Sequence, residues 1–294
     1  MVEWYEPDSW VTKLFGAHLS TFILTLVVAF GLPLCLHLWL YRHRTPINTA
    51  AFVLVGPSGA GKTSLLTALE TGRPLPTHPS QTSLRATLVL PDNHIPFSAR
   101  YRSVNDPTNA KTRGLAVIDT PGHGKLRSAA FASALAAPTN KNLRGIIYLV
   151  DAAALAAPEG LAEAAEYLHD VLLALQRRYT SAKTSKGPAA TPVLVAANKL
   201  DLFTALPPQL VRAQLEQEIE KVRTARAKGI LDVGASEDTV GEEHEWLGGG
   251  GEGRFEFKQM EEMNVPVEVV GGSVVGEEDG PDVNGWWAWI AAQM

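Results

Sequence analysis

The sequence predicts an α/β domain with a mostly parallel sheet and helices on both faces, preceded by one N-terminal transmembrane helix. Short apolar runs with strand character alternate with longer runs at helical spacing, which is typical of such a sheet. A glycine-rich stretch separates the first strand of this domain from its first helix. Residues 19–40 contain no Asp, Glu, Lys or Arg, as expected of a helix that crosses a membrane.

Strands are predicted where a short apolar run is bounded by turn-forming residues, and helices where apolar residues recur every three or four positions. The strands are residues 52–55, 84–90, 115–118, 146–150, 193–197 and 267–270, and a further short strand is considered near 99–104. The helices are residues 62–70, 125–136, 158–179, 207–227 and 283–292. In the last helix Trp286, Trp289 and Ile290 share one face, which predicts packing against the sheet.

The apolar run divides the chain into a short lumenal N-terminus at 1–18, a transmembrane helix at 19–41 and a linker at 42–49. As a helix the run is roughly 33 Å long, enough to cross a hydrocarbon core. Arg42 and Arg44 follow it, and a positive flank stays cytosolic. The basic start, short apolar core and cleavage site of a signal peptide are missing. A buried core helix is the remaining alternative, which the all-round apolar character disfavours.

The rest of the chain, residues 50–294, is predicted to be one cytosolic domain with a flexible insertion at about 233–253. That insertion is acidic and contains four consecutive glycines. The net charge of −5 argues against a nucleic-acid-binding protein, and we expect no direct sequence-specific contact with nucleic acid. Because Cys35 is the only cysteine, an intrachain disulfide is excluded.

A phosphate-binding loop is predicted between the first strand and the first helix of the domain. Its sequence fits the pattern G-x-x-x-x-G-K-[ST], and the strand–loop–helix context disfavours a chance glycine-rich turn. Glycines allow the backbone to wrap around a phosphate at the helix N-terminus, where N–H groups point inward. Lys62 supplies a charge for the outer phosphates and Thr63 a hydroxyl for Mg²⁺. The candidate nucleotide-binding residues of this loop are Gly56, Pro57, Ser58, Gly59, Ala60, Gly61, Lys62, Thr63 and Ser64.

Two further motifs follow strands. Asp119, directly after the strand at 115–118, is placed to hold Mg²⁺, and Gly122 can bring its N–H to a γ-phosphate. Asn198, Lys199 and Asp201 follow the strand at 193–197. The Asp201 carboxylate can accept two hydrogen bonds from guanine that adenine cannot donate, while Lys199 lies along the base and Asn198 ties the loops together.

The three motifs in this order resemble those of Ras-like guanine-nucleotide-binding proteins, and the form of residues 119–123 also resembles translation factors. Together with the apolar N-terminal helix, residues 81–83, 119–127 and 255–257 make the chain similar to the β subunits of the signal recognition particle receptor. The resemblance covers essentially the whole chain. It implies an endoplasmic reticulum membrane protein with a cytosolic P-loop GTPase domain, paired with the receptor α subunit and through it with the particle and the ribosome.

The resemblance also implies roles for single residues. Thr82 matches the first switch threonine, which would complete the Mg²⁺ shell with Thr63 and Asp119; Thr77 and Ser83 are the alternatives. Ser273 and Val274 lie where the family's base-binding loop usually reads Ser-Ala-Lys. The lysine is missing here, but the Val274 N–H can still reach the guanine carbonyl because that contact needs no side chain.

His123 occupies the position at which many such GTPases carry the glutamine that orients water. It either orients water or points away. Ser58 replaces a common glycine, and an internal arginine finger is suggested only by sequence proximity, at Arg85, Arg100 or Arg102. Slow intrinsic GTP hydrolysis is therefore expected.

The sequence thus favours a membrane-anchored GTPase that acts as a nucleotide-dependent docking subunit. One alternative is a membrane-tethered GTPase whose main output is turnover in another trafficking step. Another is an ATP-using kinase or transporter subunit, against which Asp201 argues.

Overall fold

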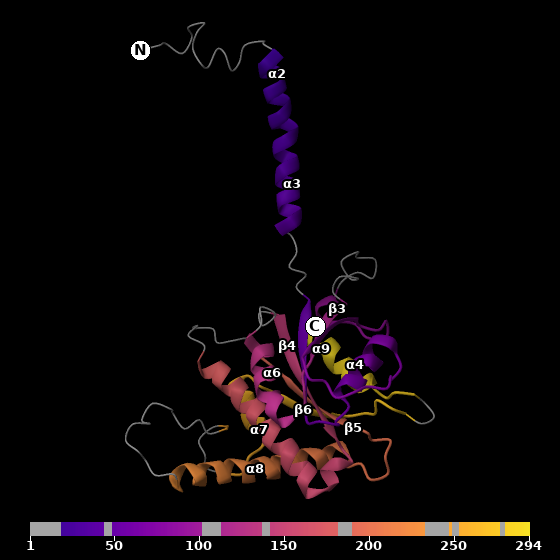
Figure 1. Cartoon of the computed structure of the whole chain (residues 1–294), viewed down its shortest axis with the longest axis vertical. Coiled ribbons are helices and arrows are strands. Elements are labelled where there is room, and N and C mark those ends of the chain that lie inside the picture. Colours follow the sequence, from indigo (N-terminus) through magenta and orange to yellow (C-terminus); the bar gives the residue numbers. More distant parts are fainter. Residues whose placement is uncertain are drawn as a thin grey trace. The chain divides into compact units, whose positions relative to one another are not determined.

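The computed structural model describes residues 19–43, 49–101, 113–136, 142–181, 190–232, 247–248, 253–276 and 280–294. The chain divides into two compact units, residues 1–48 and residues 49–294 (Figure 1).

The described part of the first unit consists of three consecutive helical elements. They are α2 (Leu19–Leu26), the π-helix η1 (Val27–Gly31) and α3 (Leu32–His43). Large apolar side chains along them, such as Phe22 and Phe30, are exposed. Within the described residues, no single helix combines the length and the apolar character needed for a membrane span. The predicted lumenal segment 1–18 and most of the linker 42–49 lie outside the described residues.

The second unit is built on a six-stranded sheet. The strands are β1 (Ala50–Val55), β2 (Leu84–Val89), β3 (Gly114–Asp119), β4 (Leu143–Asp151), β5 (Val193–Asn198) and β6 (Val267–Gly271), in the spatial order β2-β3-β1-β4-β5-β6. β2 runs antiparallel to β3, whereas the other neighbouring pairs are parallel. The predicted mostly parallel sheet is therefore confirmed.

Helices cover both faces of the sheet because successive strand residues point to opposite sides. Val53 and Val55 pack with α6 (Gly124–Ala136), α7 (Pro158–Thr180) and α8 (Pro208–Asp232). Phe52 and Leu54 pack on the other face with α4 (Lys62–Thr71) and α9 (Asn284–Gln293) (Figure 1). As predicted, the face of α9 formed by Trp286, Trp289 and Ile290 is buried.

Some elements differ from the predictions. β4 and α8 are longer than expected, and three 3₁₀-helices had no recognised signal, namely η2 (Phe97–Ala99), η4 (Ala154–Ala156) and η6 (Phe257–Met263). Where a short strand was considered near 99–104, the described residues form the end of η2 and a turn, and 102–104 lie outside the described chain. The alternation of apolar residues there was too short to distinguish a strand from a 3₁₀ turn.

The predicted flexible insertion at 233–253 lies mostly outside the described residues. Leu247 within it is buried in the core under α7 and α8. The Gly248 N–H donates to Oε1 of Gln176 at 2.9 Å, and the Arg223 guanidinium donates to the Gly253 carbonyl at 2.7 Å. Leu247 and Gly248 are therefore attached to the domain.

The parallel strands place two different sets of loops at opposite edges of the sheet. We call the edge where β1, β3, β4 and β5 end the strand-end edge, and the edge where they begin the strand-start edge. The register pairs Leu54 with Asp119 and Asp151 with Asn198, so the three sequence motifs converge on the strand-end edge. The connection from β2 to β3 lies at the strand-start edge, because Val89 pairs with Gly114.

Candidate functional site: a nucleotide site at the strand-end edge

The phosphate loop connects β1 to α4 through three glycines with positive φ. Gly56, Gly59 and Gly61 have φ values of 146°, 79° and 97°. A Cβ atom on Gly56 would lie 2.1 Å from the Leu149 carbonyl oxygen, so the loop can pass β4 only without a side chain there. α4 begins at Lys62 with no side-chain cap, which leaves its first N–H groups directed at the space inside the loop.

Lys62 is buried and folds back over the loop. Its Nζ atom donates to the carbonyl oxygens of Gly56 at 2.9 Å and Pro57 at 2.8 Å. Burial lowers the pKa of Lys62 to about 8, against the opposing effect of the negative charges of Asp119 and Glu163. The ammonium therefore lies at the loop, in an environment that favours an added anion.

Three hydroxyl and carboxylate groups meet next to this loop. The Thr63 hydroxyl donates to Oδ2 of Asp119 at 2.7 Å, and the Ser80 hydroxyl lies 2.9 Å from Thr63 Oγ1 and 3.2 Å from the same Asp119 oxygen. Asp119 is fully buried, and its Oδ1 atom has no hydrogen-bond partner among the described residues. Burial raises the pKa of Asp119, although Thr63, Lys62 and Ser80 oppose that rise. A buried carboxylate with an unpartnered oxygen beside a threonine hydroxyl fits a hard divalent cation.

The structure does not bring the expected switch threonine to this cluster. Thr82 is exposed, and the hydroxyl next to Thr63 belongs to Ser80 instead. Thr77, an alternative considered from the sequence, pairs with Ser64 at 3.0 Å. Ser80 carried no motif signal, because a serine in a polar loop is too common to single out.

Gly122 packs directly against the phosphate loop. A Cβ atom at this position would lie 2.4 Å from Lys62 Nζ and 2.8 Å from the Ser58 nitrogen. The next residue, His123, is exposed and precedes α6. Its ring Nδ1 accepts the Lys125 N–H at 3.4 Å, and its carbonyl accepts the N–H groups of Leu126 and Arg127. The imidazole therefore acts as a helix cap in this structure.

The base-binding loops are held together by one side chain. Nδ2 of Asn198 donates to the Ala60 carbonyl at 2.9 Å, and its Oδ1 accepts the Val274 N–H at 3.0 Å. Asn198 therefore connects the phosphate loop, its own loop and the loop after β6. Because the Val274 N–H is engaged by Asn198, its expected contact with guanine is not open in this structure. The neighbouring Ser273 pairs with Asp282 through the backbone.

Lys199 and Asp201 complete this part of the site. Lys199 has a φ of 65°, and its Nζ atom lies 2.5 Å from Oδ2 of Asp151. Asp151 ends β4, and its other oxygen accepts the N–H groups of Ala153 and Ala154. Asp201 is exposed and faces solvent, as a carboxylate that receives a base must. Sequence reasoning missed Asp151, although an aspartate at a strand end was an available signal.

The family model for the signal recognition particle receptor beta subunit matches residues 47–265 of the chain. The chain belongs to this family. A yeast receptor β subunit, from Saccharomyces cerevisiae, is 33% identical over 183 residues, which cover 62% of each chain. Two solved structures from Chaetomium thermophilum are also similar. One is the receptor β subunit with GDP and Mg, at 37% identity and a TM-score of 0.60, covering 84% of this chain and 99% of that one. The other is the β subunit with GTP in complex with SRX, at 35% identity and a TM-score of 0.63, covering 82% and 98%.

The arginines suggested as internal fingers in this family member lie in different places. Arg85 is exposed on β2 and pairs in register with Ile118, near the strand-end edge. Arg100 follows η2 in the connection at the strand-start edge, and Arg102 lies outside the described residues. A six-residue strand is about 20 Å long, so the backbone of Arg100 is on the wrong side of the sheet for an internal finger.

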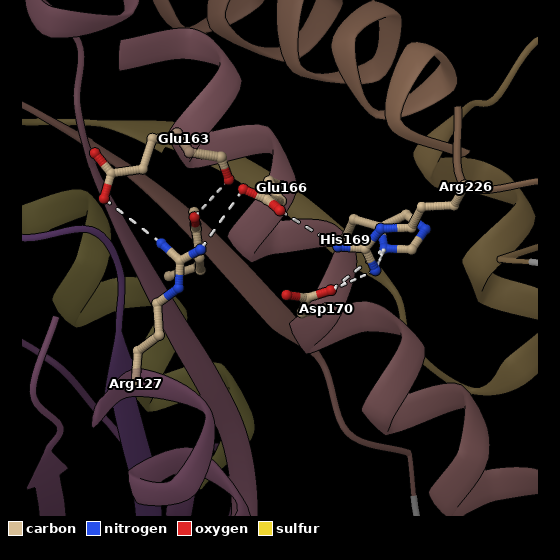
Figure 2. Close-up of polar contacts among 8 residues, drawn as sticks. Arg127, Glu163, Glu166, His169, Asp170 and Arg226 are labelled. Carbon is tan, nitrogen blue, oxygen red and sulfur yellow. Dashed lines mark hydrogen bonds and ion pairs between the residues drawn. The ribbon is translucent and has the colours of Figure 1, made fainter. Parts of the chain in front are cut away.

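A charged network extends from α6 to α7 and was missed from the sequence. Figure 2 shows Arg127 of α6 directed at Glu163 and Glu166 of α7, with nitrogen–oxygen distances of 3.5 and 3.8 Å. Its guanidinium carbon also lies 4.7 Å from the centre of the Tyr167 ring. Arg127 therefore fixes the start of α6, and with it the Gly122 turn, against α7.

The network continues to α8 through Arg226. Its guanidinium lies 3.7 Å from Glu166 and 2.7 Å from Asp170, and Nη1 lies 3.1 Å from Nδ1 of His169 (Figure 2). Burial opposes ionisation of Asp170, but hydrogen bonds from His169 and Arg226 outweigh it and lower the pKa of this carboxyl. Glu166 thus joins two arginines from different helices.

Proposed function

We propose that this chain is the GTP-binding β subunit of a signal recognition particle receptor, which anchors the α subunit at the endoplasmic reticulum membrane for cotranslational targeting. The observation that carries the nucleotide part is the Asn198 connection, which holds the phosphate loop and the base loops in one arrangement beside the exposed Asp201. The Chaetomium relatives, which carry GTP or GDP with Mg, support the same ligands for this chain.

GTP is bound by groups that already converge on the strand-end edge. Its outer phosphates replace the Gly56 and Pro57 carbonyls as partners of Lys62, and the guanine base pairs with Asp201. Mg²⁺ takes the Thr63 hydroxyl and, through water, the free oxygen of Asp119. Thr82 then moves inward to the γ-phosphate and metal, which orders its loop.

The membrane part of the proposal rests on residues 19–41. Their exposed apolar side chains and the following Arg42 and Arg44 support a single span with the short N-terminus in the lumen and the GTPase domain in the cytosol. Resistance of the full chain to carbonate extraction, with cytosolic protease access to the domain, tests this arrangement. Protection of the domain inside sealed vesicles would reverse the orientation.

The α subunit is proposed to bind the GTP form through residues 71–84 and 122–136. Both segments flank the γ-phosphate position, so their order depends on nucleotide, and the coupling must be reciprocal. Chaetomium SRb–GTP in its complex with SRX supports this partner. Calorimetry of residues 45–294 with the α-subunit domain is the test. We expect binding with GTP and much weaker binding with GDP or in Thr63→Asn, and equal affinity in all three states would reject the nucleotide switch.

Intrinsic hydrolysis is proposed to be slow. The His123 ring is engaged as a helix cap, and Arg100 lies at the opposite edge of the sheet. Turnover under excess GTP tests this point, because rapid multiple turnover in the absence of a partner would favour an enzyme whose output is hydrolysis itself.

A further inference from the structure

The connection after β2 exposes large apolar side chains at the strand-start edge, away from the nucleotide site. We call residues 91–101 the apolar loop. Ile95, Phe97 and Tyr101 in it are 64%, 60% and 91% exposed. A group of large apolar side chains in one exposed loop is typical of an interaction surface rather than of a solvated turn. The partner surface proposed above, at 71–84 and 122–136, does not include it.

The apolar loop leaves the sheet beside the first residue of β1. Leu88 and Ala50 both pair with Leu115 of β3, one from each side. Ala50 is also the point at which the chain from the N-terminal apolar segment enters the sheet. Only residues 44–48 lie between α3 and the second unit, and five residues reach at most about 18 Å when fully extended. A membrane that holds residues 19–41 is therefore within a short distance of the strand-start edge.

Charge is distributed along this edge in a way that suits a membrane surface. The connection at 90–113 contains four basic and two acidic residues, and those at 137–142 and 181–192 add three lysines and no acidic residue. The connection at 233–266, which enters the outermost strand β6, contains nine acidic and two basic residues. In a chain with a net charge of −5, the basic residues thus gather at the strand-start edge between β2 and β5. Cytosolic leaflets are anionic and attract such basic segments.

We propose that the apolar loop inserts Ile95, Phe97 and Tyr101 into the interface of the cytosolic leaflet. Aromatic and aliphatic side chains next to basic residues suit the headgroup boundary, where the rings meet acyl chains and the charges meet lipid phosphates. This contact would orient the domain with its nucleotide edge toward the cytosol, open to the α subunit. The proposal rests on the membrane anchor proposed above.

Fluorescence quenching in vesicles tests the contact with the full chain. In a Cys35→Ser background, Phe97→Cys carries an environment-sensitive fluorophore, and Ala213→Cys, exposed on α8, is the matched control. The vesicles contain lipids with spin-labelled acyl chains, with or without an anionic lipid. We expect severalfold stronger quenching at position 97 than at 213, and stronger quenching with the anionic lipid.

Two further measurements make the result decisive. Ile95→Asp with Tyr101→Asp should abolish the excess quenching at position 97, whereas Leu210→Asp on α8 should not, and GTP binding reports that each variant folds. Equal quenching at 97 and 213 in a chain that stays in the vesicles after alkaline extraction would overturn the loop contact and leave the anchor standing. Loss of the chain from the vesicles on extraction would instead reject the anchor, and the loop contact with it.

Discussion

The two halves of the nucleotide site differ in how their polar groups are paired. In the phosphate half, Lys62 and Thr63 are bonded to protein oxygens that a nucleotide and its metal must replace. In the base half, Asn198 already holds the loops in place while Asp201 remains exposed. The base half is therefore preorganised, whereas the phosphate half must exchange partners. Phosphate affinity is a difference between two sets of contacts, and base selectivity is not.

The largest effect is expected from Lys62→Ala in the phosphate half. GTP affinity should fall by more than about a hundredfold, since charge-assisted hydrogen bonds to two phosphates are lost. Stability against urea should hold or rise, because the substitution removes a buried charge. Titration with fluorescent GTP and urea unfolding measure the two quantities. A variant that binds GTP within tenfold of the parent protein would show that this ammonium does not bind phosphate.

The second effect concerns the base half alone. Asp201→Asn should lose about 2–4 kcal/mol of GTP binding and gain preference for xanthine nucleotide, because the amide can donate where the carboxylate accepted. Asp92→Asn, a carboxylate in the connection at the strand-start edge, is the control. Competition titrations with both nucleotides measure the preference, and an unchanged preference for guanine would remove Asp201 from base recognition.

Asn198→Ala tests whether one side chain preorganises the base half. It leaves the buried Ala60 carbonyl and Val274 N–H without partners, which should cost about 2–3 kcal/mol of unfolding free energy. GTP affinity should fall by a similar amount, as the loops must then be ordered on binding. Urea unfolding with and without GTP separates the two losses. If both stay at the parent values, the loops are held by other contacts.

The pH dependence should appear only in ligands that reach the phosphate half. Because burial lowers the pKa of Lys62 to about 8 from the unfolded value of 10.5, the folded state binds fewer protons than the unfolded state between these pH values. Unfolding free energy from this group therefore rises with pH across the window. GTP binds the charged ammonium, so its affinity should fall as pH rises above 8, by up to about tenfold per unit. Guanosine, which lacks phosphates, corrects for ionisation of the base, and parallel profiles for both ligands would contradict the assignment to Lys62.

The smallest effect is expected at His123. Replacement by Ala removes the acceptor of the Lys125 N–H and should cost about 0.5 kcal/mol of unfolding free energy. Single-turnover GTP hydrolysis should change little. A rate loss of about a hundredfold, the size expected when a catalytic acid or base is removed, would instead assign His123 to the chemistry.

The sequence by itself determined the strand order of events along the chain, the parallel sheet and the position of each motif. These features are encoded in contiguous residues, since glycine positions, apolar runs and a strand followed by a helix are local properties. They were sufficient to place Lys62, Thr63, Asp119, Asn198 and Asp201 at one edge of the sheet.

Only the tertiary structure decided which distant residues meet. It put Ser80 rather than Thr82 beside Thr63, and it paired Lys199 with Asp151. It also gave the Val274 N–H to Asn198, whose sequence partner is many residues away. These contacts depend on loop packing and strand register, which bring together residues whose separation along the chain carries no local signal. Which end of a strand a loop leaves, and hence which edge the apolar loop occupies, follows from that same register.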